Sequence, residues 1–260
     1  MSAVLQYTLH LADNALVLGQ RNAEWCGHGP VLEEDIALAN IGLDLIGQAR
    51  LLYQYAASLQ GGSATENTLA YFRNPAEFRN YVLLELPHNT AYAPSASVER
   101  DYAVTIARNF LYSSLMLLVW ERLQNGQDTQ LAAIAAKSIK EVRYHLRHST
   151  DWMLRLGDGT AASNQRLQAA LDHLMPYTQE FWCNSPMEQA AMAEGVAPDL
   201  LPCKTAWLQG IEQVVALATL RLPAASGYVT HGKGGQHSEH LSYLLTEMQS
   251  LAREHPNATW

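Results

Sequence analysis

Apolar residues recur at helical intervals along most of the chain, and turn residues divide this pattern into long segments. The first segment begins at Val4 and ends near Glu24, before a turn rich in Gly and Pro. The second begins at Val31 and ends at Gln60, where the following Gly61-Gly62 pair suits a helix C-terminus. Residues 4–60 are therefore predicted to form two long helices joined by a short turn.

A second pair of long helical segments is predicted within residues 99–156. Its first helix ends before Gly126, and Asp128 or Thr129 can cap the start of the second. The intervening residues, 61–98, contain three prolines and only short apolar runs, so only short helices are expected there. This segment is predicted to be a crossover between the two antiparallel pairs.

Two antiparallel helix pairs joined by one long crossover are typical of ferritin-like four-helix bundles. Further helices are predicted within residues 163–253, and the stretch 183–189 has the composition of a turn between two of them. The pattern contains no strand signal, internal repeat or low-complexity tract. We therefore predict an all-α protein, a ferritin-like four-helix bundle with additional C-terminal helices, as a single domain over residues 1–260.

Composition narrows the class of protein. Hydrophobic residues make up 48% and charged residues 16% of the chain, as in globular proteins with a large core. A net charge of -8 argues against binding to nucleic acid. The longest strongly apolar stretch, Phe110 to Trp120, is too short to cross a bilayer, so no membrane span is expected. The N-terminus lacks the pattern of a secretory signal, which predicts a cytoplasmic protein.

The cysteine pattern indicates neither a disulfide scaffold nor a zinc site. Cys26, Cys183 and Cys203 are odd in number, far apart in the sequence, and form no Cys-x-x-Cys pair. Free, buried thiols are the simplest expectation.

Catalytic ferritin-like proteins hold two iron ions with a Glu from each of two helices and a Glu-x-x-His from each of the other two. The one Glu-x-x-His match, Glu85 to His88, contains a proline and lies in the crossover. The second predicted helix offers Asp44, with Gly47 at the position of the His. The fourth offers Glu141, with Tyr144 at that position and His145 one residue further on.

These positions predict a former metal site that has become a polar core. Folding each helix pair about its turn places Asp13 near Asp44, and Asn109 or Tyr112 near Glu141. Buried carboxylates without a metal need protonation, hydrogen bonds or cationic partners. The nearby candidates for that role are Lys140, Arg143 and His145. A retained metal, exposure at the surface, and a metal face formed by Glu141, His145 and His148 are the alternatives.

Several motifs resemble those of the C-type subunits in the phenylacetyl-CoA epoxidase family, and together they cover essentially the whole chain. The motifs are Glu24 to His28, Leu38 to Arg50, Lys140 to Arg147, Gly232 to Leu241 and Glu247 to Gln249.

The resemblance implies a specific role. In that family a homologous A-type subunit holds the di-iron centre and epoxidises the ring of phenylacetyl-CoA, and a separate reductase supplies electrons. The C-type subunit binds the A-type subunit and supports its structure. The resemblance therefore implies a non-catalytic subunit without a cofactor of its own, with iron in the partner.

Two segments could touch phenylacetyl-CoA, since Arg and Lys suit phosphate and aromatic rings can stack on adenine. Alternatively, the aromatic residues Phe72 and Phe78 anchor the crossover to the bundle, and the Gly-rich stretch is a flexible connection or, through His237, Glu239 and His240, a partner contact. The candidates for CoA contact are Arg73, Glu77, Phe78, Arg79 and Asn80 in the crossover and Lys233 in the Gly-rich stretch.

Two other functions remain open from the sequence. One is an active di-iron oxygenase that uses altered ligands, and the other is a helical interaction protein unrelated to oxygenation. The scarcity of Glu-x-x-His pairs weighs against the first, and the family motifs weigh against the second.

Overall fold

The computed structural model describes residues 2–90 and 99–258, so that the predicted crossover residues 91–98 lie outside the described part. The chain divides into two compact units. Unit 1 comprises Met1–Leu86, Ser185–Glu194 and His231–Trp260, and unit 2 comprises Pro87–Asn184 and Gly195–Thr230. The chain therefore passes between the units four times. The organisation as a single domain stays a prediction.

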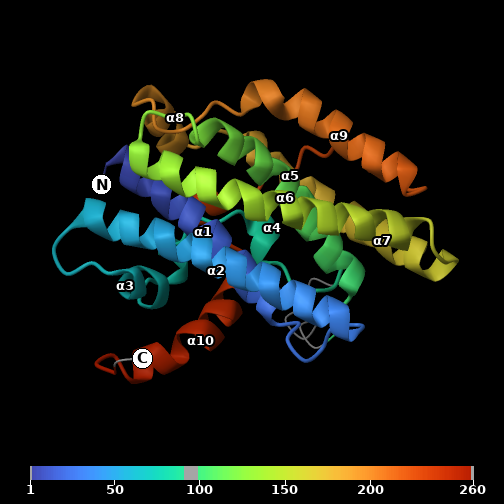
Figure 1. Ribbon diagram of the computed structural model, residues 1–260, viewed down its shortest axis with the longest axis horizontal. Coiled ribbons are helices and arrows are strands. Elements are labelled where there is room, and N and C mark those ends of the chain that lie inside the picture. Colours follow the sequence, from blue (N-terminus) through green and yellow to red (C-terminus); the bar gives the residue numbers. More distant parts are fainter. Residues whose placement is uncertain (1, 91–98, 259–260) are drawn as a thin grey trace. The chain divides into compact units, whose positions relative to one another are not determined.

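Unit 1 is built on a long antiparallel pair, α1 (Ala3–Ala23) and α2 (Leu32–Gln60), which lie side by side in Figure 1. The Ser2 side chain caps α1, and Gly61, with a φ of 70°, ends α2 as the sequence predicted. The two helices approach closely where Gly19 faces Gly42, since a Cβ on Gly42 would lie 3.3 Å from the Gly19 carbonyl oxygen. This contact fixes the register of the pair.

Shorter elements pack around this pair within unit 1. Of these, α4 and α8 contact α1, α3 contacts α2, and α10 contacts both α3 and α4. Their bounds are Glu66–Tyr71 for α3, Pro75–Glu77 for the 3-10 turn η1, Val82–Glu85 for α4, Pro186–Ala193 for α8, Gly232–Gly234 for the 3-10 turn η5 and Glu239–Glu254 for α10.

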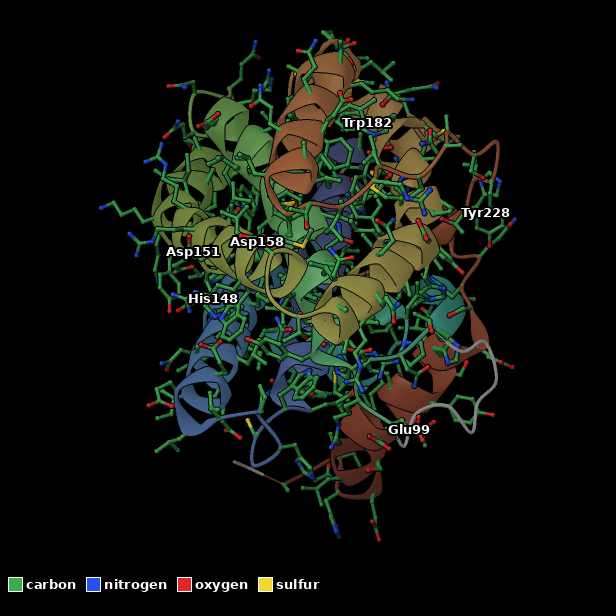
Figure 2. The ribbon with its side chains drawn as sticks, turned by 90° about the vertical axis from the view of Figure 1, so that its right-hand side faces the viewer. Glu99, His148, Asp151, Asp158, Trp182 and Tyr228 are labelled. Carbon is green, nitrogen blue, oxygen red and sulfur yellow. The ribbon has the colours of Figure 1, made fainter. Side chains whose placement is uncertain are left out.

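Unit 2 is built on the second predicted pair, α5 (Tyr102–Leu123) and α6 (Thr129–Gly157). The side chains of Asp101 and Asp128 cap these helices. The remaining elements are α7 (Ala161–Leu174), the 3-10 segment η3 (Met175–Trp182), the turn η4 (Leu201–Cys203) and α9 (Lys204–Leu217), and α7 and α9 pack against α5 and α6. Figure 2 labels His148 and Asp151, two residues of α6.

The predicted all-α, ferritin-like class is confirmed. The residues that the structure describes form helices and no strand, apart from a single bridge between His231 and Gln236. Helix α8 falls in the stretch that the sequence assigned to a turn. Ser185 and Glu188 form a capping box there and Pro186 occupies the first turn, so a helix starts where only a turn was predicted.

Helix α9, one of the helices predicted within residues 163–253, ends at Leu217. Thr219 has a φ of 57°, and this left-handed residue stops the helix. The chain can turn there because the neighbouring Ala218 carbonyl packs against Gly157, where a Cβ would lie only 2.2 Å from the Ala218 oxygen.

Helix α5 is long and apolar enough to cross a membrane by length and composition, although its central run alone is too short. However, 83% of its most apolar window is buried inside the protein. This burial is what a core helix requires, because its apolar side chains already have protein neighbours.

The prediction of buried thiols holds for one cysteine only. Cys203 is buried, whereas Cys26 and Cys183 are exposed, because both lie in turns outside the packed helices.

Candidate functional site

A buried carboxylate at the centre of unit 1, that of Asp13 on α1, receives four hydrogen bonds. The Tyr53 hydroxyl donates from 2.6 Å and the Arg79 backbone N–H from 2.8 Å. The Arg73 guanidinium donates twice, with one nitrogen at 3.1 Å and the other in closer contact. The negative charge of Asp13 is therefore neutralised by Arg73. The candidates that the sequence suggested, Lys140, Arg143 and His145, are wrong for this carboxylate.

The guanidinium of Arg73 is surrounded by groups that stabilise its positive charge. It stacks over the ring of Phe78 at 4.3 Å and donates to the backbone carbonyls of Leu69 and Glu77. Burial by itself would lower the pKa of Arg73, but the Asp13 carboxylate outweighs burial and raises it. Burial, with the negative charge of Asp13, raises the pKa of Tyr53 well above its usual value. The cluster is thus a buried ion pair between Asp13 and Arg73, with Tyr53 in its neutral form.

A second buried ion pair joins α8 to the Gly-rich stretch. The Lys233 ammonium lies 2.7 Å from Glu188 Oε2, and both side chains are buried. The same carboxylate accepts the Ser185 backbone N–H at 2.8 Å. Burial tends to raise the pKa of Glu188, but Lys233 and the nearby His10 hold it below its usual range. Burial lowers the pKa of His10.

A third buried pair joins α4 to the start of α10. His237 Nδ1 lies 2.8 Å from Glu85 Oε2, and His237 Nε2 lies 3.0 Å from the Phe78 carbonyl oxygen. Since both ring nitrogens face acceptors, the doubly protonated imidazolium is favoured. Burial lowers the pKa of His237, but Glu85 and the carbonyl outweigh burial and raise it. Glu85 also accepts hydrogen bonds from Asn80 and from the Ser238 backbone N–H.

The glycines of residues 232–235 allow this stretch to lie directly against the crossover backbone. A Cβ on Gly232 would lie 2.3 Å from the Asn80 carbonyl oxygen. Gly235 has a φ of 84°, and a Cβ there would lie 2.5 Å from the Ala76 carbonyl oxygen. The glycines therefore serve close backbone packing within unit 1, and Lys233 is buried at their centre.

We expect Gly232→Ala to lower the free energy of unfolding by about 1–3 kcal/mol, because the methyl group forces the stretch away from Asn80. Gly234→Ala is the matched control, since nothing lies within 4 Å of a Cβ at that position. Urea unfolding of the two variants measures the difference. Equal stability of the two would show that the stretch does not pack as tightly as described.

The raised pKa of His237 predicts a pH dependence of stability. A group whose pKa is higher in the folded state stabilises the fold fully below its unfolded pKa, near 6.5, and this contribution is lost as pH rises through the folded pKa. The stability advantage of the wild type over His237→Gln should therefore shrink as pH rises from about 6 to 9. Urea unfolding across this range tests it, with exposed His255→Gln as the control. An advantage that grows with pH would contradict the assignment.

Four of the predicted positions of the former metal site lie off the buried faces of α2 and α6. Asp44 and Glu141 are half-buried, and Gly47 and Tyr144 are exposed. The register of α1 on α2 places Asp13 beside Tyr53, more than two turns along α2 from Asp44. The predicted approach of Asp13 to Asp44 is thus wrong.

In unit 2, some of the residues predicted for the polar core are buried and others are exposed. His145 and Asn109 are buried, as the polar-core prediction requires, and so is Tyr112, whose pKa is raised by burial. Lys140 and Arg143 are exposed on α6, where Arg143 lies 3.9 Å from Glu121.

The buried pairs at three-residue spacing lie one residue further along each helix than the sequence suggested. On α2 they are Leu45 and Gln48, and on α6 they are Val142 and His145. Neither pair is Glu-x-x-His, because Leu45 and Val142 have no ligand atom and Gln48 has an amide in place of an imidazole. Among the residues that the structure describes, no three His, Cys, Asp or Glu side chains are placed to hold a metal ion. The residues present therefore do not fit a di-iron centre.

The single Glu-x-x-His match of the sequence is divided between two hydrogen-bond networks. Glu85 belongs to unit 1 and bonds to His237, as described above. His88 belongs to unit 2, where its Nδ1 lies 2.7 Å from the Thr105 hydroxyl and 2.8 Å from an Arg108 nitrogen. The two side chains thus serve different networks.

The candidates for CoA contact lie partly on a pocket of about 400 Å³ in unit 1. Arg73, Glu77 and Arg79 line it, whereas Phe78, Asn80 and Lys233 do not. The guanidinium of Arg73 is bound to Asp13, so a phosphate there would compete with a buried carboxylate. Lys233 is held by Glu188, so a phosphate contact would require that pair to open. Contact with CoA at this pocket stays a prediction.

Helix content, the two long antiparallel pairs and the missing ligand set define an all-α protein of the ferritin-like class without the di-iron signature. Comparison with known proteins makes this specific. The family model described as phenylacetic acid catabolic protein matches residues 1–260, the entire chain. The chain is 44% identical over 260 residues to the C subunit of 1,2-phenylacetyl-CoA epoxidase from Escherichia coli (strain K12), covering 100% of both proteins. The chain belongs to the phenylacetic acid catabolic protein family, and the resemblance drawn from its motifs is confirmed.

Proposed function

We propose that this chain is the non-catalytic structural subunit of a phenylacetyl-CoA epoxidase in aerobic phenylacetate degradation. It binds and supports a homologous catalytic subunit that holds the di-iron centre, within a cytoplasmic complex with the other epoxidase components. The full-length similarity to the C subunit of the Escherichia coli enzyme supports this role.

The observation that carries the proposal is the identity of the inward-facing pairs. Leu45 and Gln48 on α2 and Val142 and His145 on α6 are buried pairs at the three-residue spacing that an active member fills with Glu-x-x-His. Two Glu-x-x-His pairs would supply two carboxylates and two imidazoles to the iron ions. Of these four groups, the pairs of this chain contain only the imidazole of His145. Oxygen activation by two iron ions therefore has to take place in another chain.

The three buried ion pairs of unit 1 support a scaffold role. Asp13 with Arg73, Glu188 with Lys233, and Glu85 with His237 each join elements that are far apart in the sequence. All six side chains are engaged in these pairs and are largely buried. Such pairs fix one arrangement of elements, which suits a protein whose task is to present a constant surface.

An apolar stripe on the outer face of α2 supplies a surface for the partner. Leu32, Ile36, Leu43 and Gly47 lie at helical spacing, and the three large side chains are 73%, 52% and 67% exposed. A Cβ on Gly47 would meet nothing within 4 Å, so a second helix can approach closely there. None of the exposed positions from Ile36 to Gly47 is charged. This is the composition of the buried part of an interface.

Co-expression with the catalytic chain tests the proposal. We expect this chain to co-purify with it, to contain no stoichiometric iron, and to show no turnover alone. Epoxidation of phenylacetyl-CoA should require both chains. Iron and turnover in this chain alone would establish the alternative of an active oxygenase with altered ligands. Failure to co-purify, with full epoxidation in its absence, would establish an interaction protein unrelated to oxygenation.

A further inference from the structure

Unit 2 carries an apolar groove that no part of the proposed function uses. It lies between α6 and α9, which pack side by side over α5, and has a volume of about 260 Å³. The main apolar residues that line it are Phe110, Leu118, Leu146, Trp207 and Val214. The Trp207 indole donates a hydrogen bond of 2.8 Å to Ser114, so the polar groups at its floor are already paired.

The edge of the groove on α9 is uncharged and built from small residues. Ala206, Gly210 and Val214 line the groove at helical spacing, and Leu217 continues this face of α9 beyond it. A Cβ on Gly210 would meet nothing within 4 Å, and Leu217 is 71% exposed. At about 1.5 Å per residue, this edge is roughly 16 Å long, which matches three turns of a helix.

The opposite edge, on α6, is basic. Leu146 and Thr150 line the groove, and Arg143 and Arg147 stand beside them on the outer side of the same helix, with Lys140 next in line. Asp151, four positions beyond Arg147 on the same helix, is an exposed acidic residue near this edge. Arg143 lies 3.9 Å from Glu121, and these two side chains are 59% and 41% exposed. Such a pair is weak and readily exchanged for another carboxylate. A basic edge is a local exception in a protein of net charge -8.

We propose that this groove binds an acidic, amphipathic helix of a partner protein. Its apolar face would lie in the groove against Gly210 and Leu146, and its carboxylates would pair with Arg143 and Arg147. A helix-in-groove complex needs an apolar floor, a small residue for close approach and a charge that sets orientation, and the groove provides all three. The site is separate from the stripe on α2, so its failure leaves the proposed function standing.

Binding of designed peptides tests this proposal. The probes are fluorescein-labelled helical peptides of about three turns, with three Leu on one face and Glu beside them, and a matched set with Lys in place of Glu. Fluorescence anisotropy with the full chain should show the Glu peptides binding at least about 10-fold more tightly, and this preference should shrink at high salt.

Variants locate the binding. Gly210→Leu adds a side chain at a position where a Cβ meets nothing within 4 Å, and it should weaken binding of the Glu peptides by about 10-fold or more. Arg143→Glu with Arg147→Glu should reverse the preference between the two peptide sets. Lys137→Glu, an exposed change on the same helix outside the groove, is the control and should have little effect.

Four outcomes would overturn the proposal. They are the absence of binding, equal binding of both peptide sets, retention of binding in Gly210→Leu, and displacement of the peptides by duplex DNA. Sedimentation that shows self-association of the wild type, abolished by Gly210→Leu, would assign the groove to a second copy of this chain and would likewise overturn it.

Discussion

Arg73→Met should lower the free energy of unfolding by about 3–5 kcal/mol, because it leaves the Asp13 carboxylate buried without a cation. Tyr53 and the Arg79 N–H would still donate to Asp13, but neither carries the compensating charge. Chemical denaturation of the purified variant measures the loss. This would be a large part of the total stability of an ordinary domain.

Two further variants show whether the loss has this origin. Asp13→Asn combined with Arg73→Met removes both charges and should recover a substantial part of the stability. Arg50→Ala breaks an ion pair to Glu66 of similar length, 3.0 Å, but its side chain is 67% exposed, so the change should cost no more than about 1 kcal/mol. Equal losses for Arg73→Met and Arg50→Ala would contradict a buried, dominant pair.

Leu43→Glu should weaken binding to the catalytic chain by roughly 100-fold while leaving the isolated chain folded. The side chain is already 67% exposed, so a carboxylate costs little in the free protein. In the complex the same carboxylate would be buried against an apolar surface without a partner. Titration calorimetry of the two purified chains measures the affinity, and circular dichroism checks the fold.

Gln54→Glu is the matched control for this substitution. It adds the same charge to the same exposed face of α2, but beyond the apolar part of the stripe. Affinity should change little. If both variants bind like the wild type, the stripe is not the partner surface, and the complex must use another face.

Helix periodicity and capping residues predicted the long elements well, because both are local properties of the sequence. Asp128 and Gly61 mark helix ends in the structure as they do in the sequence. Helix α8 was missed although Ser185, Pro186 and Glu188 form a capping box with proline in the first turn. Asn, Ser and Pro in this stretch are also the residues of a turn, so their composition alone predicts a turn.

The interior positions could be predicted only to within one residue. Successive side chains on a helix are about 100° apart, so a shift of one position turns an inward residue toward solvent. The predicted pairs ended at Gly47 and Tyr144, whereas the buried pairs end at Gln48 and His145. The conclusion that the ligand set is incomplete holds in either register.

The ion pairs could not be predicted because they join residues that are distant in the sequence. Nothing local in Asp13 indicates Arg73, and Glu85 lies far from His237 along the chain. The backbone freedom of the Gly-rich stretch is compatible with phosphate binding when only the sequence is considered. What it provides is room for the Asn80 and Ala76 carbonyls, a property that exists only after the chain has folded.

The passage of the chain between the two units constrains its synthesis. Lys233 and His237, which complete two of the three buried pairs, lie in the most C-terminal segment of unit 1 and are synthesised after the rest of that unit. Until that segment emerges, Glu188 and Glu85 lack the cations that make their burial tolerable, so unit 1 cannot close. A truncated or stalled chain would therefore remain open and subject to proteolysis, and only finished molecules would be available for assembly.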